Sequence, residues 1–425
     1  MAVNMNHEGY SRRLEVIEST LKAKGLQASK IEPVEYIENG PMPYNNFIYK
    51  VEIVSPMSAG VFPASSQPFT TTPIDEISTF IFRMSNPKAD GVNNTNRIEN
   101  EIAALHLCRK ALSNKSKEYA KIVPAVYDWA SQTYPSVPDE SGFGWIMMEF
   151  LPGVPLDKEF ASMEAPQRSE ILEQIAIIFS VLQAIQLPSE VDSHGGLTIK
   201  NGEIVSGQPT IAHGGPWKSY RGWWEGLLLM AVSQAESSPV LKGWKENGLR
   251  GRIDKFIQNG IEPLLKDVDG TKRVLVHGDF TTNNVLYNPE TKKISGLLDF
   301  DFTVVTHPYY EFAKSFSTMG WHGNEAIGAA IIKGEFGEEP PAEAGAEDWN
   351  LAKEWHAALA EQDAQMPSSI KGIESLRTLG MLEALLCPVS LYYPFMLKRH
   401  KPEDLHKMMA AAEGNLSGHL ESLGY

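Results

Sequence analysis

The residues best suited to chemistry lie in one short stretch of the C-terminal half. His277, Asp279 and Asn284 come first, and Asp299 and Asp301 follow after two apolar runs. The apolar runs are separated by an Asn-Pro turn, which predicts a β-hairpin. Its open end brings Asn284 and Asp299 together, with Asp279 on the loop that leads into it.

These side chains offer hard oxygen donors with a single histidine and no sulfur. Such a set suits Mg²⁺, which binds one or two carboxylates and keeps other positions for phosphate and water. A remaining carboxylate could orient or deprotonate a hydroxyl group. Asp and Asn near turns often only cap backbone amides, but the length of the combined pattern favours a functional site over that explanation.

The elements that position this stretch change along the chain from β-rich to α-rich. Predicted strands cover residues 47–53, 77–84 and 145–150, and predicted helices cover 11–24, 97–111, 171–185, 220–234, 252–265 and 372–399. Residues 55–73 and 334–345 are expected to be loops. We therefore expect an α+β chain in two parts, residues 1–150 and 151–425, with the β-rich island 273–301 in the second part.

Composition excludes several classes of protein. The 425 residues carry 38 Lys and Arg against 53 Asp and Glu, a net charge of −15, which opposes a nucleic-acid partner. No apolar run approaches the roughly 20 residues of a membrane span. Cys108 and Cys387 are the only cysteines, too few for a disulfide scaffold, and no targeting signal is evident. A cytoplasmic protein without a membrane partner is expected.

The run from His277 to Asn284, together with Leu298–Asp301 and the run from His307 to Phe312, resembles the aminoglycoside phosphotransferase and choline kinase superfamily. The residues around these motifs look like those of a mostly uncharacterised branch that is common in filamentous fungi, and the resemblance covers roughly residues 30 to 400. The resemblance implies a bilobal protein-kinase-like fold. It also implies that ATP and Mg²⁺ are used to phosphorylate a hydroxyl group of a small molecule.

By this resemblance each residue of the stretch has a role. Asp279 would be the catalytic base toward the acceptor hydroxyl, and Asn284 and Asp299 would bind Mg²⁺. His277 would brace the loop. Asp301 would either orient its neighbours or face the substrate.

The N-terminal part should supply a cation for the phosphates and a glutamate that pairs with it. The resemblance places the cation on the strand 77–84, where Arg83 stands, with Lys50 as the rival. On the following helix, a step of about 100° per residue places Glu101 on the apolar face with Leu105 and Cys108. Glu101 is therefore the predicted partner of Arg83.

The rest of the nucleotide site is less distinct. Residues 38–47 occupy the place of a glycine-rich turn but contain one Gly and two Pro, so Asn45 or Asn46 is expected to line the nucleotide. By the resemblance, Met148, Glu149 and Leu151 form the hinge, where the carbonyl of Glu149 and the amide of Leu151 would bind adenine.

Three questions stay open at this point. Trp217, Trp223 and Trp224 either belong to the core or stack on a cationic or aromatic acceptor. The poor glycine loop and Arg83 also fit a nucleotide-binding protein without turnover that acts through interactions. A metal-dependent hydrolase built on His277, Asp279 and Asp299 is a third hypothesis.

Overall fold

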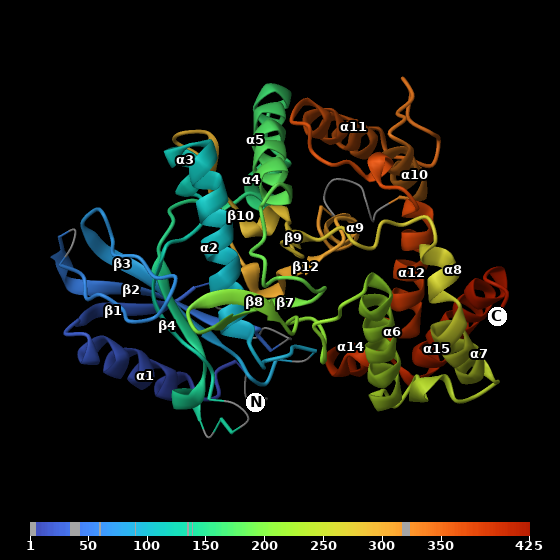
Figure 1. The fold of residues 1–425 in the computed structure, drawn as a ribbon, viewed down its shortest axis with the longest axis horizontal. Helices are drawn as coiled ribbons and strands as arrows, with labels where there is room; N and C mark the ends of the chain where they lie inside the picture. Colours follow the sequence, from blue (N-terminus) through green and yellow to red (C-terminus); the bar gives the residue numbers. More distant parts are fainter. Residues whose placement is uncertain are drawn as a thin grey trace.

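The computed structural model describes residues 6–34, 43–58, 61–89, 91–133, 136–137, 139–316 and 324–425. A β-sheet forms the N-terminal region, and helices dominate the C-terminal region (Figure 1). The predicted loop 38–47 lies partly outside the described residues, so its shape is not part of the account below.

The N-terminal sheet has five strands in the order β1-β2-β3-β5-β4, and all neighbours are antiparallel. The strands are β1 (Ala28–Pro33), β2 (Asn46–Met57), β3 (Ile77–Ser85), β4 (Val126–Ala130) and β5 (Trp145–Glu149). Side chains alternate between the two faces, as the strand period of two requires.

Each face of this sheet has its own partner. Phe47 and Tyr49 of β2 belong to a core formed with Ile17 of α1 (Tyr10–Ala23). Helix α2 (Arg97–Lys115) packs on the opposite side, where Ile102 shares a core with Ile146. Figure 1 shows α2 between the sheet and the helices of the C-terminal region, so this helix can touch both.

The C-terminal region contains three small sheets around the predicted hairpin. β10 (Val285–Asn288) pairs with β11 (Lys293–Leu297) and β6 (Val154–Pro155), β9 (Val274–Val276) pairs with β12 (Val304–Thr306), and β7 (Gly196–Lys200) pairs with β8 (Glu203–Gly207). Short 3₁₀ turns include η3 (Thr282–Asn284) and η4 (Phe300–Phe302), which flank the open end of the hairpin.

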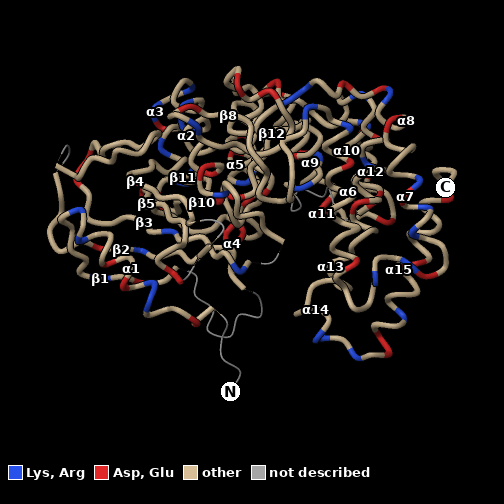
Figure 2. The backbone as a smooth tube through the Cα atoms, turned by 60° about the horizontal axis from the view of Figure 1, so that its bottom comes forward, with Lys and Arg blue, Asp and Glu red and all other residues tan. Residues whose placement is uncertain are grey.

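Helices build the remainder of the described chain. After α3 (Lys117–Ala120) they are α4 (Asp157–Phe160), α5 (Ala165–Gln183), α6 (Tyr220–Ser237), α7 (Leu249–Asn259), α8 (Ile261–Leu265), α9 (Tyr309–Lys314), α10 (Glu325–Lys333), α11 (Ala346–Glu361), α12 (Ile373–Leu386), α13 (Val389–Tyr392), α14 (Pro394–Arg399) and α15 (Pro402–Ser422). None of the helices in the described part of the chain has the length and apolar character needed to cross a bilayer. Acidic and basic positions are both scattered over the two regions (Figure 2).

The expected α+β architecture, with a β-rich N-terminal region and a mostly helical C-terminal region, is confirmed, and several details differ. The predicted helix 372–399 is broken into α12, α13 and α14 near Pro388 and Pro394, because proline lacks the N–H that a helix interior needs. The predicted helix 252–265 is divided into α7 and α8 at Gly260. The β7–β8 hairpin and the helices α11 and α15 were not predicted. The assignment of nucleotide binding to residues 1–150 and of catalysis and acceptor binding to residues 151–425 stays a prediction.

Candidate active site

The hairpin predicted from the sequence sets the geometry of the site. Val285 of β10 is paired with Leu297 of β11, and the Leu298 N–H donates to the carbonyl of Asn284 over 2.8 Å. This last bond fixes Asn284 and Asp299 at the same end of the hairpin. The structure therefore brings together the side chains that the sequence placed there.

Asn284 holds the carboxylate of Asp279. Its side-chain Nδ2 donates to Oδ2 of Asp279 at 2.7 Å and to the Asp279 carbonyl at 2.9 Å. Since the amide nitrogen is occupied in this way, the amide oxygen of Asn284 is turned away from Asp279 and receives only a 3.3 Å contact from Asn283. That oxygen is available as a metal ligand.

Asp279 has the electrostatics of a general base. Burial and, after it, the negative charge of Asp299 raise the pKa of Asp279 to about 6, although the hydrogen bond from Asn284 opposes the shift. A carboxyl group with a pKa near 6 is ionised at neutral pH and yet holds a proton better than an ordinary aspartate. Such a group can take a proton from a hydroxyl.

His277 fixes the backbone of the loop. Its Nδ1 accepts the N–H of Asp279 at 3.3 Å, so the proton is on Nε2, which donates to the carbonyl of Leu298 at 3.0 Å. Burial lowers the pKa of His277 to about 4, so the ring is neutral. Both nitrogens are engaged by the backbone, which argues against the hydrolase hypothesis that needs His277 as a metal ligand.

Gly278 is required by the backbone path. Its φ is +80°, and a Cβ atom at this position would lie 2.5 Å from the carbonyl oxygen of Phe302. A side chain would meet both a strained conformation and a backbone clash. Glycine here lets the loop press against the segment that follows Asp299.

Glu311, which no prediction assigned a role, positions the same loop from α9. One carboxylate oxygen accepts the N–H of His277 at 2.6 Å, and the other accepts the N–H of Gly278 at 3.1 Å. Ser315, one turn later, donates to Glu311 at 2.5 Å and accepts the N–H of Phe280 at 2.8 Å. In the sequence, Glu311 is recognisable only as an acidic residue four positions before a serine. This spacing is too common to indicate a role.

Asp299 stands in a left-handed backbone conformation with φ +60° and ψ +65°. Its Oδ1 is buried and has no hydrogen-bond partner among the described residues, and the nearest cation is Nη2 of Arg83 at 3.8 Å. Burial raises the pKa of Asp299, and the charge of Asp301 raises it further. A strained carboxylate whose Oδ1 accepts no hydrogen bond is suited to binding a cation.

The donors present fit Mg²⁺. Asn284 and Asp299 offer oxygen atoms at the open end of the hairpin, and the described residues contain no group of three His, Cys, Asp or Glu that would form a closed protein cage. Mg²⁺ is commonly held by one or two protein oxygens together with phosphates and water.

Asp301 is fully buried and does not face an acceptor. Burial by itself would raise the pKa of Asp301, but the charges of Arg97 and Arg83 outweigh it and lower the pKa to about 2. Of the two roles considered for Asp301, the geometry fits the one in which it orients its neighbours.

The structure pairs Arg83 of β3 with Glu101 of α2, both of them buried. Lys50, the rival cation, lies on the same face of the sheet as Arg83. Ile48 is the residue of β2 opposite Arg83, and Lys50 is two residues further along β2, opposite Ile81. Lys50 is 3.5 Å from Glu52 and lies over the Phe150 ring at 4.9 Å. Arg83 is therefore the cation beside Asp299.

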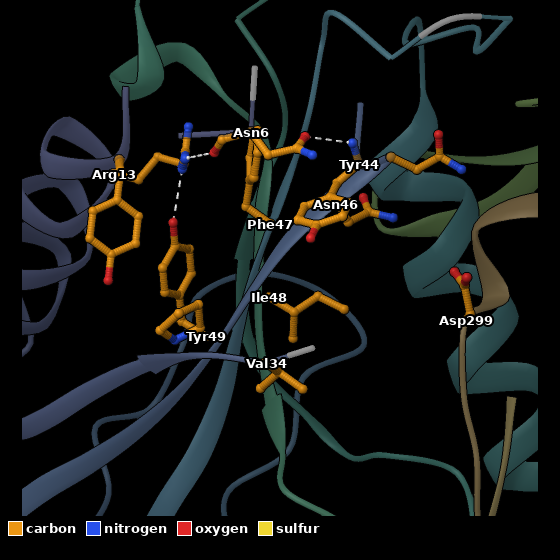
Figure 3. A pocket seen from close by; sticks show the side chains of 12 residues that line it. Asn6, Arg13, Val34, Tyr44, Asn46, Phe47, Ile48, Tyr49 and Asp299 are labelled. Carbon is orange, nitrogen blue, oxygen red and sulfur yellow. Dashed lines mark hydrogen bonds between the residues drawn. The ribbon is translucent and has the colours of Figure 1, made fainter. Parts of the chain in front are cut away.

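Asn46 lies at the start of β2 on the wall of a cavity of about 250 Å³. Figure 3 shows Asp299 across this cavity from Asn46 and Ile48. Both ends of the Asn46 amide are already bonded, to Asp301 at 3.1 Å and to Arg97 at 3.1 Å. A contact from Asn46 to a nucleotide thus stays a proposal.

The predicted hinge follows β5. Met148 is nearly buried on the same face as Lys50 and Ile81. The side chain of Glu149 accepts hydrogen bonds from Arg109 at 3.0 Å and from the N–H of Ala125 at 3.0 Å. Its backbone N–H donates to the carbonyl of Ala125 at 2.8 Å. A role of the Glu149 carbonyl in binding adenine stays a prediction.

Leu151 is the second backbone group predicted to bind adenine. It is 9% exposed. In the part of the chain that the structure describes, its N–H reaches no backbone carbonyl.

The tryptophans lie mainly in the core. Trp223 is 0% and Trp224 1% exposed, and Trp217 packs edge-on against Trp223 with ring centroids 5.5 Å apart. Trp223 is too deeply buried to stack on an acceptor. Trp224 alone of the three lines a further cavity, described below.

Comparisons with known proteins were made on sequence and on structure. Residues 70–345 match the phosphotransferase enzyme family, and none of the curated proteins matches the chain. Similar solved structures include a thermostable mutant of aminoglycoside phosphotransferase APH(4)-Ia in ternary complex with AMP-PNP and hygromycin B. It is 13% identical, with 96% of this chain and 98% of that chain covered and a TM-score of 0.47.

Two others are ADP-bound aminoglycoside phosphotransferase APH(2'')-Ib and an ethanolamine kinase of Plasmodium vivax. The first is 11% identical, with 96% and 98% of the two chains covered and a TM-score of 0.46. The second is 14% identical, with 93% and 82% covered and a TM-score of 0.41. The family match spans well over half of the sequence and contains the whole stretch from His277 to Asp301, and the chain therefore belongs to the phosphotransferase enzyme family.

Proposed function

We propose that the protein is a kinase that uses ATP and Mg²⁺ to phosphorylate a hydroxyl group of a small molecule. One observation carries the proposal: Asp279, held by Asn284, shares the open end of the hairpin with the unpartnered carboxylate oxygen of Asp299. A base and a metal site side by side are what phosphoryl transfer requires of a protein.

In this proposal Asp279 accepts the proton of the acceptor hydroxyl. The hydroxyl oxygen then forms its bond to the γ-phosphorus, the bond from phosphorus to the leaving oxygen of ADP breaks, and the proton stays on Asp279. Asn284 and Asp299 would hold Mg²⁺, which when bound neutralises charge on the phosphates. His277 and Glu311 keep the loop in place through the backbone bonds described above.

The nucleotide would lie between the N-terminal sheet and the hairpin. Its adenine edge would bind the carbonyl of Glu149 and the amide of Leu151, with Met148 against the ring. Arg83, oriented by Glu101, would face the phosphates. Asn46 would contribute at the start of β2.

The reacting hydroxyl of the acceptor would lie within hydrogen-bond reach of Asp279. The rest of the acceptor would extend toward a cavity of about 510 Å³ between α6, α9, α10 and α12. Helix α9 separates this cavity from the loop of residues 277–280, which we call the catalytic loop. Tyr310 and Lys314 line the cavity, whereas Glu311 and Ser315 bond the loop on another face of the same short helix. The cavity is thus one helix away from Asp279.

The walls of this cavity favour a polar acceptor with one flat or apolar side. Lys314 lies 3.3 Å from Glu383 and 5.4 Å from the centre of the Tyr310 ring, and Arg377 completes the charged rim. Charged side chains can bind amino, carboxylate or hydroxyl groups, and the tyrosine face can pack against a ring or a cation.

A second candidate is a nucleotide-binding protein without turnover. The observation that favours it is that Arg83 and Asn46 both contact Asp301, so neither is free to give all of its donors to phosphates. Turnover decides between the two candidates, because such a protein would bind ATP and yield no product with any acceptor.

The test begins with calorimetry of ATP binding with and without Mg²⁺. We expect binding that is at least about tenfold tighter with Mg²⁺, since a metal between Asp299 and the phosphates removes like-charge repulsion. Release of ADP is then measured against a panel of aminoglycosides, amino alcohols and sugars. Failure to bind ATP under either condition would refute the proposal.

Two variants sharpen this test. Asp279→Asn should keep the affinity for ATP within about threefold and lose at least about a thousandfold in turnover, because it removes the base and leaves the metal ligands. Asp254→Asn, an exposed aspartate on α7 that bonds Arg250, is the matched control and should change neither.

A further inference from the structure

Arg97, the first residue of α2, is buried and bonded at every nitrogen of its side chain. Its Nε donates to Asp301 at 2.7 Å, and Nη2 donates to the other oxygen of the same carboxylate. Nη2 also reaches the carbonyl of Asn45 at 2.9 Å and the amide oxygen of Asn46 at 3.1 Å. Nη1 reaches the carbonyl of Asn86 at 3.3 Å. No prediction from the sequence concerned this residue.

These bonds join segments that are far apart in the chain. Asn45 precedes β2, Asn46 begins it, and Asn86 follows β3. Asp301 follows the predicted metal ligand Asp299 by two residues and lies 204 positions after Arg97. A single guanidinium therefore connects the N-terminal sheet with the turn that carries Asp299.

The carboxylate of Asp301 is saturated by groups of the N-terminal region. Besides the two bonds from Arg97 it accepts one from Asn46 at 3.1 Å, and Nη2 of Arg83 lies 3.4 Å away. Phe300, between the two aspartates, is buried with its ring 4.6 Å from that of His277. Any shift of Asp301 must therefore move Asp299 or disturb His277.

We propose that Arg97 is a positioning residue of the active site and that, with Asp301, it forms a latch that fixes Asp299 relative to the start of β2. A planar guanidinium that grips both oxygens of a carboxylate sets orientation as well as distance. The part of the inference that concerns Asp299 as a metal ligand rests on the proposed function. The latch itself rests on the bonds of Arg97 alone.

The latch also determines where the charge of Arg83 is directed. Nη2 of Arg83 already lies 3.4 Å from Asp301, and without Arg97 the unpaired buried carboxylate would draw Arg83 still closer and away from Asp299. With Arg97 bonded to both oxygens of Asp301, Arg83 keeps its bond to Glu101 and its place 3.8 Å from Asp299. Arg97 therefore influences both Arg83, the cation proposed to face the phosphates, and Asp299, the proposed metal ligand.

The test replaces Arg97 by Lys in the full chain. Lysine keeps the positive charge but, as a single compact donor group, cannot bond both oxygens of Asp301 and the carbonyl of Asn45 together. Arg13→Lys is the matched control. Arg13 is equally buried, and its bonds to Tyr49 at 2.8 Å and Asn6 at 2.7 Å stay within the N-terminal region (Figure 3).

Hydrogen–deuterium exchange is the primary readout because it does not depend on activity. In Arg97→Lys the amides of residues 46–48 and 299–303 should exchange about tenfold faster than in the parent. Arg13→Lys should affect α1 and also residues 46–48, because its guanidinium lies 3.7 Å from the centre of the Phe47 ring, but it should leave residues 299–303 unchanged. Calorimetry is the second readout. Arg97→Lys should weaken Mg²⁺-dependent ATP binding by about tenfold, and the control should not.

The results separate the latch from the proposed function. If exchange in residues 299–303 is the same in Arg97→Lys as in the parent, or rises equally in both variants, the latch is refuted. If the parent protein fails to bind ATP but exchange changes as expected, the latch stands and the proposed function fails. If exchange changes while Mg²⁺-dependent affinity is unaffected, the claim that the latch positions Asp299 is refuted.

Discussion

Replacing Asp279 by Asn is expected to stabilise the metal-free protein while abolishing turnover. In the folded chain the carboxylate of Asp279 is partly buried and close to the charge of Asp299, and both effects penalise its ionised form. An asparagine has no charge to bury, and its amide oxygen can still accept the bond from Asn284.

The size of the effect follows from the pKa. Burial and then Asp299 raise the pKa of Asp279 from 3.8 to about 6. A shift of about two units at roughly 1.4 kcal/mol each gives about 3 kcal/mol, which solvent screening at this partly exposed site reduces to about 2 kcal/mol. With an unfolding entropy of about 2 cal/mol/K per residue, the melting temperature should rise by about 2–3 °C.

The stability difference between Asp279→Asn and the parent should depend on pH in a definite direction. Because the folded pKa is the higher one, protonation favours the folded chain. The stability linked to that protonation is fully present below about pH 4 and is lost as the pH rises through about 6. The advantage of Asp279→Asn over the parent should therefore be near zero at about pH 4 and complete at about pH 8.

The assay is thermal unfolding in a chelator over this pH range, with the exposed-site variant Asp254→Asn as the control. The control should follow the parent at every pH. Parallel curves for Asp279→Asn and the parent, or a variant that is less stable at pH 8, would show that Asp279 carries no charge penalty and would refute the reasoning.

Three further changes test other parts of the site. Gly278→Ala should cost about 2–4 kcal/mol in urea unfolding, because its Cβ would lie 2.5 Å from the carbonyl oxygen of Phe302 at a φ of +80°, and a loss below about 0.5 kcal/mol would contradict this. Glu311→Gln should leave one buried N–H of His277 or Gly278 without an acceptor and cost about 1–3 kcal/mol, with turnover falling at constant ATP affinity in calorimetry; an equal fall in both would exclude an effect through the loop. Asp299→Asn, which tolerates the left-handed backbone, should remove the Mg²⁺ dependence of ATP affinity measured by titration calorimetry, and an unchanged dependence would exclude Asp299 as a ligand.

Local patterns were enough to predict much of the catalytic stretch. Asn284 and Asp299 meet because a short hairpin fixes its own register, so their proximity depends only on sequence between them. The family resemblance placed the cation Arg83 on the strand 77–84, and the helical period then identified Glu101 as its partner, a contact that the structure contains.

Contacts that depend on the packing of distant segments could not be predicted. Arg97 lies one helical turn before Glu101 on the same face of α2, and this position was the available signal for its burial. Its partner Asp301 is 204 positions away, and no local pattern pairs them. Glu311 could not be predicted for a related reason. Its partners are backbone N–H groups, which nearly every residue has, so no sequence pattern identifies them.

The two faces of α9 have a consequence for how such a protein could acquire new acceptors. Tyr310 and Lys314 border the larger cavity, whereas Glu311 and Ser315 hold the catalytic loop. If the acceptor extends into this cavity as proposed, substitutions at the first pair would change the acceptor wall and leave the bonds that hold the loop in place. Directed evolution of acceptor range should therefore begin at residues 310 and 314.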